Sequence, residues 1–90
     1  GARRMRVGIP SPLRSYTSGL DEVQARGATL VGLLADLEQR FPGIRFRMID
    51  EQGRIREHIR LFVNSELARD LERELSDRDH VQILCAISGG

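Results

Sequence analysis

The sequence contains no lysine and no tryptophan, only one cysteine, and only 4% aromatic residues. A single cysteine excludes an intramolecular disulfide and a thiolate metal cluster. A net charge of +1 and so few aromatic rings argue against non-specific nucleic-acid binding, which usually needs a strong basic excess and stacking side chains. No apolar stretch is long enough to span a membrane, and the first residues lack the apolar core of a secretory signal. We therefore expect a soluble, cytoplasmic protein that binds neither nucleic acid nor membrane.

The length of 90 residues and the 40% hydrophobic content predict one compact domain with an aliphatic core and little room for a deep catalytic cavity. We expect residues 5–87 to form this domain. Residues 1–4 are expected to precede it, as disordered or cloning-derived residues. Residues 88–90 are expected to follow it as a flexible tail that ends in two glycines.

Two strands and a loop are predicted at the start of the chain. Met5, Val7 and Ile9 alternate with Arg6 and Gly8, which is the period of a half-buried strand. The stretch PSPLRSYTSG is rich in proline, serine and glycine and predicts a loop, after which LDEVQA, residues 20–25, resumes a strand. The two strands are expected to form a hairpin with a long connection.

A helix is predicted from Thr29, which is a good N-cap, to the Pro42–Gly43 stop signal. Its apolar residues recur at spacings of three and four and share one face: Leu30, Leu33, Leu34, Leu37 and Phe41. An amphipathic helix of this kind has to bury its leucine stripe against another element.

The second half of the chain predicts two more strands. Ile55, Ile59, Leu61 and Val63 alternate with polar residues, which indicates a strand with one solvated face. The spacing of Leu67, Leu71 and Leu75 predicts a helical turn or two. The last strand, residues 81–87, is apolar on both faces, as strands in the middle of a sheet are. Residues 44–50 give no clear pattern.

A strand–strand–helix–strand–helix–strand order with a central terminal strand predicts an α+β protein of β-grasp, ubiquitin-like architecture. A mixed sheet of about four to five strands would wrap one main helix.

On this fold, several stretches together resemble the ThiS and MoaD family of ubiquitin-like sulfur carriers. They are VGIPSPLR and YTSG in the first hairpin, TLVGLLADLEQRFPGI in the helix, IRLFVN in a strand, and LSDRDHVQILCAISGG at the end. The hairpin loop is most similar to that of the CysO branch. The resemblance covers nearly everything from Met5 to Gly90.

The resemblance implies that the chain is a protein cosubstrate rather than an enzyme. A ubiquitin-activating-like adenylating enzyme would use ATP to activate the carboxylate of Gly90, and sulfur would then replace AMP to give a thiocarboxylate. Ile87, Ser88 and Gly89 would form the tail that enters the partner. Glycine suits a narrow channel because it has no side chain to clash. No bound cofactor and no metal are expected in the chain itself.

Candidate partner-binding residues are Phe62 and Leu84, with Arg14 and Arg60 as a polar rim, because apolar residues beyond what one helix can cover mark interaction sites. For Leu84 a place in the core remains an equal alternative. Cys85 lies near the sulfur-carrying end and could relay a persulfide, but a small buried hydrophobe is the favoured interpretation.

The acceptor of the sulfur stays open between cysteine, molybdopterin and thiamine synthesis. A CysO-like carrier implies a pyridoxal-phosphate cysteine synthase and a metalloprotease that releases the product. The alternative function is a ubiquitin-like modifier joined to target lysines through Gly90. A plain β-grasp interaction module is a third hypothesis, and an enzyme is the least favoured.

Overall fold

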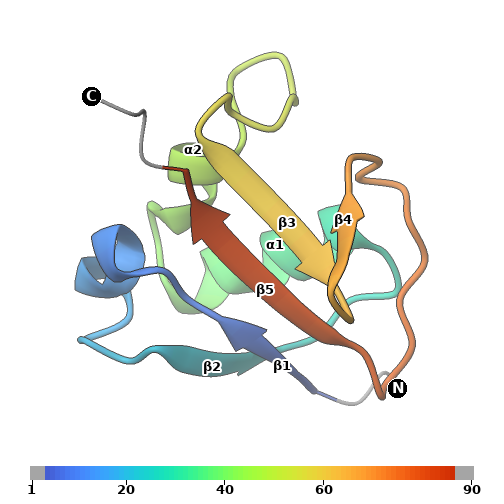
Figure 1. Ribbon diagram of the computed structural model, residues 1–90. Helices are drawn as coiled ribbons and strands as arrows, with labels where there is room; N and C mark the ends of the chain where they lie inside the picture. Colours follow the sequence, from blue (N-terminus) through green and yellow to red (C-terminus); the bar gives the residue numbers. More distant parts are fainter. Residues whose placement is uncertain (1–3, 87–90) are drawn as a thin grey trace.

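The computed structural model describes residues 4–86 and contains one mixed sheet of five strands (Figure 1). The strands are β1 (Met5–Gly8), β2 (Glu22–Ala25), β3 (Ile59–Val63), β4 (Glu66–Ala68) and β5 (His80–Cys85). Their order across the sheet is β2-β1-β5-β3-β4. Strand β5 is therefore central, as its apolar sequence predicts.

Strand β5 pairs in parallel with β1 and antiparallel with β3. Because β1 also pairs antiparallel with β2, and β3 with β4, the last strand lies between two hairpins and next to the first strand. This arrangement, with the main helix on one face, is the β-grasp fold expected from the sequence (Figure 1).

The main helix α1 (Leu30–Arg40) buries its predicted leucine stripe against the sheet. The side chains of Leu30, Leu33, Leu34 and Leu37 are fully buried. The hydroxyl of Thr29 accepts a hydrogen bond from the Gly32 amide at 3.2 Å, so the predicted N-cap is confirmed. Phe41 ends the helix as its C-cap and is half-buried.

Two further helical segments lie in regions for which the sequence predicts a loop or nothing definite. The predicted hairpin loop contains a 3₁₀ helix, η1 (Ser11–Tyr16), and the ambiguous stretch after α1 forms a short helix, α2 (Ile44–Met48). Strand β3 begins at Ile59, whereas Ile55 only bridges to Ile49.

The predicted helical turns at Leu67, Leu71 and Leu75 are wrong. Leu67 belongs to strand β4, which pairs with β3, and the chain beyond it forms turns at residues 71–72 and 77–78 but no helix. The Leu71 carbonyl accepts a hydrogen bond from Val31 at 2.9 Å, and the Leu75 amide donates to Ala28 at 2.8 Å. These long-range backbone bonds at the start of α1 outweigh the local four-residue spacing.

Among residues 4–86, no helix is both long enough and apolar enough to cross a membrane.

Candidate functional site

The face of the sheet opposite α1 carries an apolar patch over strands β5, β3 and β4. Phe62 of β3 lies opposite Leu67 of β4 and opposite Gln82 of β5, and Leu84 of β5 lies opposite Arg60 of β3. Side chains two residues apart on a strand share a face, so Phe62, Leu67 and Leu84 point to the same side. We call these three residues the open-face patch.

The open-face patch is accessible. Leu84 is 42% exposed and Leu67 is 39% exposed, while Phe62 is half-buried. Ile83, the neighbour of Leu84, is fully buried on the helix side. The alternatives for Leu84 are thereby resolved, because its side chain lies on the surface rather than in the core.

Leu67 is the patch residue that the sequence analysis missed. It belongs to the strand that follows a tight turn at Asn64 and Ser65, both of which have positive φ, 52° and 73°. A two-residue turn of this type joins hairpin strands, and asparagine is favoured in it. The Asn64–Ser65 pair between IRLFV and ELA was therefore the available signal for β4.

Gly8 shapes the surface beside the patch. A Cβ atom at Gly8 would come within 2.5 Å of the side-chain amide of Gln82. Gly8 thus gives the Gln82 side chain room to lie over strand β1, on the same face as Phe62. Any larger residue at Gly8 would displace this amide.

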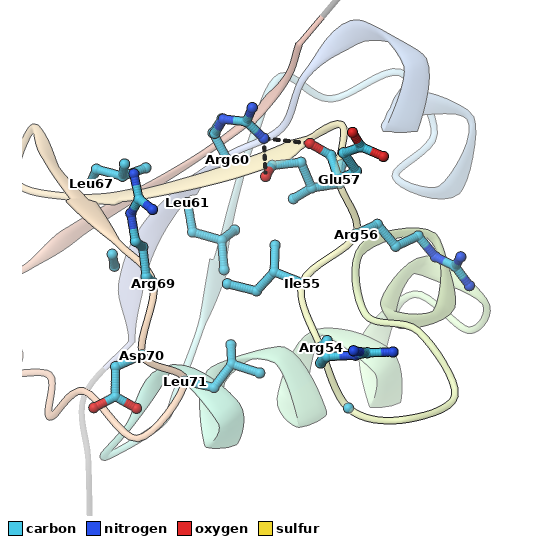
Figure 2. Close-up of a pocket in the computed structure, with 13 residues that line it drawn as sticks. Arg54, Ile55, Arg56, Glu57, Arg60, Leu61, Leu67, Arg69, Asp70 and Leu71 are labelled. Atoms are coloured by element: carbon cyan, nitrogen blue, oxygen red, sulfur yellow. Dashed lines mark hydrogen bonds between the residues drawn. The ribbon is translucent and has the colours of Figure 1, made fainter.

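Arg14 and Arg60 lie on either side of β5. The Nε of Arg14, in η1, donates a hydrogen bond to the Ile9 carbonyl at 3.0 Å, just beyond the end of β1. The Nη1 of Arg60, in β3, donates to the carbonyls of Glu57 and Ile59 (Figure 2). Both guanidinium groups are therefore positioned by neutral backbone groups, which leave their charge in place.

The C-terminal end of β5 lies next to the start of β3. Cys85 pairs with Ile59, and the Ala86 amide donates a hydrogen bond to the His58 carbonyl at 2.7 Å. The proposed tail residues Ile87, Ser88, Gly89 and Gly90 lie outside the described residues. Because Leu84 is near the end of β5, the open-face patch adjoins the point from which this segment starts.

Cys85 is half-buried. Burial raises the pKa of its thiol above the ordinary value, while the nearby charge of Arg47 acts in the opposite direction. A raised pKa keeps the group as a thiol at neutral pH, and thiols are poor nucleophiles. This environment fits the structural role favoured from the sequence.

The two histidines lie at opposite ends of the paired strands β3 and β5 and do not form a cluster. His58 is exposed before β3, whereas His80 starts β5 with its Nε2 buried and without a hydrogen-bond partner among the described residues. Within residues 4–86, no three His, Cys, Asp or Glu side chains are close enough to hold a metal ion.

Comparison with known proteins finds relatives of this chain that are sulfur carrier proteins. The family model described as "ThiS family" matches residues 7–90. The sulfur carrier protein CysO of Mycobacterium tuberculosis is 37% identical over 89 residues, which cover 93% of this chain and 96% of that protein.

Solved structures agree with this relationship. CysO in the Amycolatopsis orientalis BexX/CysO complex is matched with a TM-score of 0.89 and 38% identity, covering 96% of this chain and 99% of that one. Mycobacterium tuberculosis CysO gives a TM-score of 0.87 at 35% identity, covering 92% of this chain and 99% of that one.

The archaeal protein SAMP1 from Haloferax volcanii shares the fold, with a TM-score of 0.82 at 23% identity, covering 98% of this chain and all (100%) of that one. At this identity the likeness supports the fold alone. The family match and the CysO relatives, in contrast, cover nearly the whole chain. The protein belongs to the ThiS family of ubiquitin-like β-grasp proteins.

Proposed function

We propose that this protein is a sulfur carrier whose Gly90 carboxylate is adenylated by a partner enzyme and converted to a thiocarboxylate. The observation that carries the proposal is the family match over residues 7–90, which includes the terminal diglycine, together with 37% identity to a sulfur carrier protein. The chain itself acts as a cosubstrate and supplies no catalytic group.

The chemistry explains why activation is needed. A carboxylate is a poor acyl donor because its leaving group would be oxide. Attack of a Gly90 carboxylate oxygen on the α-phosphorus of ATP expels pyrophosphate and forms a mixed anhydride with AMP. A sulfur nucleophile then adds to the acyl carbon, and AMP leaves with the electron pair of the broken acyl–oxygen bond.

The end of the chain suits this reaction because Gly89 and Gly90 have no side chains, so the backbone fits a narrow channel without clashes. Ser88 and Ile87 would supply the reach from β5. Holding the acyl carbon at the partner's reactive centre is itself a large contribution to the rate.

The open-face patch would dock the activating enzyme. Its apolar side chains supply contact area, and Arg14 and Arg60 would add charged contacts at its rim. Amycolatopsis orientalis CysO is found in a complex with BexX, which supports the use of this fold by a protein partner. We expect the acceptor to be a sulfur-accepting synthase. The CysO likeness favours a pyridoxal-phosphate cysteine synthase with a metalloprotease downstream.

A modifier function, in which Gly90 becomes joined to lysines of other proteins, shares the activation step. The chain has no lysine, so copies of it cannot be linked to one another through lysine isopeptide bonds. Denaturing gels of cell extract, probed for this protein, distinguish the two functions. A carrier gives the free chain, whereas a modifier gives a ladder of larger species.

Intact-mass measurement tests the proposal. Incubation with the activating enzyme, ATP and a sulfur source should raise the mass by the difference between one sulfur and one oxygen atom. A chain extended by one alanine after Gly90 is the matched control and should keep its mass. An unchanged mass of the natural chain, with an enzyme that loads another carrier, would contradict the proposal.

A further inference from the structure

A groove opens at the β4 edge of the sheet because the chain separates from β3 after Ala68. Strand β4 pairs with β3 only through three residues. Beyond them the chain turns toward α1, where the Leu71 carbonyl accepts from Val31 and the Arg73 carbonyl accepts from Leu30. Within residues 4–86, the first part of β3 therefore has no neighbouring strand on this side.

The loop between α2 and β3 forms the opposite wall. It is held by the bridge between Ile49 and Ile55, and by a hydrogen bond of 2.8 Å from the Arg56 amide to the Met48 carbonyl. The space between this loop and the segment after β4 is about 550 Å³ (Figure 2). This volume lies within the range of known ligand clefts.

The floor of the groove is aliphatic. Leu61 is fully buried, and Ile55 and Leu71 are half-buried beside it. Figure 2 shows the side chains of these three residues converging at the centre of the groove. The residues that line the groove include no aromatic ring, so the base stacking typical of single-stranded nucleic-acid sites is not available there.

The rim of the groove is basic. Four arginines line it: Arg54, Arg56, Arg60 and Arg69. Two of them are held by neutral groups. The Nε of Arg56 donates to the Phe46 carbonyl at 2.7 Å and its guanidinium lies 4.5 Å from the centre of the Phe46 ring. Arg60 donates to backbone carbonyls, as described above. These contacts fix the two cations, and Arg56 also lies close enough to the Asp50 carboxylate to contribute to the lowering of its pKa.

The other two arginines differ in how far an acid compensates their charge. In the described part of the chain, the Arg69 guanidinium makes no ion pair or hydrogen bond. Arg54 reaches Asp50 only at 3.7 Å, with its side chain 76% exposed. The two acids among the lining residues, Glu57 and Asp70, lie at the margins (Figure 2). The groove therefore combines an apolar floor with an excess of positive charge.

We propose that this groove binds an acidic, partly apolar segment of a partner protein. Apolar side chains of the segment would lie on Ile55 and Leu71, and its carboxylates would face the arginine rim. The inference does not depend on the sulfur-carrier function. Because Leu67 and Arg60 border both sites, the segment would lie alongside a protein docked on the open-face patch.

A synthetic peptide in which glutamate alternates with leucine is the probe. Added to the full isotope-labelled chain, it should shift the NMR signals of Ile55, Leu61 and Leu71, and a peptide with asparagine in place of leucine should bind at least about tenfold more weakly. No shift of these three signals at the highest soluble peptide concentration would overturn the proposal.

The variants Arg69→Glu and Arg78→Glu make the test specific. They change the net charge equally, but Arg78 is exposed in the turn before β5 and does not line the groove. We expect Arg69→Glu to weaken peptide binding about tenfold and Arg78→Glu to change it less than about twofold. Equal weakening by both variants would show non-specific attraction between charges and would overturn the proposal.

Discussion

The two ends of strand β5 differ in how firmly the domain holds them. At the His80 end, the His80 amide donates to the Asn64 side-chain carbonyl, and the Asn64 amide donates to the His80 carbonyl, both at 2.9 Å. Asp79 accepts from the Asn64 side chain at 2.7 Å and from the Ser76 amide at 2.9 Å. These bonds join the start of β5 to the β3–β4 turn.

At the other end, as far as residue 86, the backbone hydrogen bond beyond the paired residues runs from the Ala86 amide to the His58 carbonyl. Leu84 projects outward there, beside the proposed working end of the chain. The comparison indicates a division of labour. Among the described residues, more side-chain hydrogen bonds hold the His80 end than the Ala86 end, and we expect a partner to meet the Ala86 end. Substitutions along this strand and its neighbours test that division.

The largest loss of stability is expected where β5 enters the core. Ile83→Ala should lower the free energy of unfolding by about 2–5 kcal/mol, because the side chain is fully buried and its loss leaves a cavity. Leu34→Ala in α1 should cost a similar amount for the same reason. Denaturant unfolding measures both, and a loss below about 0.5 kcal/mol would mean that the core is misassigned.

At the His80 end, Asn64 adopts a positive φ angle and also makes side-chain hydrogen bonds, and two substitutions separate these contributions. Asn64→Gly keeps the positive φ but loses the side-chain hydrogen bonds, and should cost about 1 kcal/mol. Asn64→Ala also strains the turn, so it should cost about 1 kcal/mol more. Denaturant unfolding measures both variants. If Asn64→Gly lowers the free energy of unfolding as much as Asn64→Ala does, the positive φ angle makes no contribution to stability.

The Asp79 carboxylate makes this end sensitive to acid. Hydrogen bonding from the Ser76 amide and the Asn64 side chain, despite partial desolvation, lowers its pKa below the ordinary 3.8. A carboxyl with a lowered folded pKa stabilises the fold above its unfolded pKa, and that contribution disappears as pH falls through the folded value. The stability advantage of wild type over Asp79→Asn should thus be constant near neutral pH and shrink below about pH 4. Urea unfolding across this range checks it, and an advantage independent of pH would contradict it.

At the Ala86 end, Leu84→Asp should leave the domain folded because the side chain is exposed, with a change in unfolding free energy below about 1 kcal/mol. Sulfur loading should nevertheless fall, since a charge in the open-face patch weakens docking. Gln24→Glu, which adds the same negative charge at an exposed residue on the far edge strand, is the control for a general charge effect. If Leu84→Asp is loaded with sulfur normally, Leu84 is not part of the docking surface.

The sequence predicted the central strand and the main helix because their patterns are local. Residues 81–87 are apolar on both faces, and the leucine stripe of α1 has one period throughout. Strand β4 was missed because Leu67, Leu71 and Leu75 have the spacing of a helix. The structure there is instead determined by backbone hydrogen bonds to Ala28 and Val31, which are distant in the sequence. The patch residues Phe62 and Leu84 were predicted, but Leu67 and the arginine-lined groove depend on strand pairing, which no local pattern shows.

Removal of Gly90 tests the division of labour most directly when the melting temperature and the sulfur loading are measured on the same protein. Gly89→Val is its companion, because a β-branched side chain widens the end and restricts its backbone. Both variants should melt within about one degree of wild type, and both should fail to gain the sulfur mass. A Gly90-deleted chain that loads sulfur at the wild-type rate would contradict the claim that Gly90 is the working end.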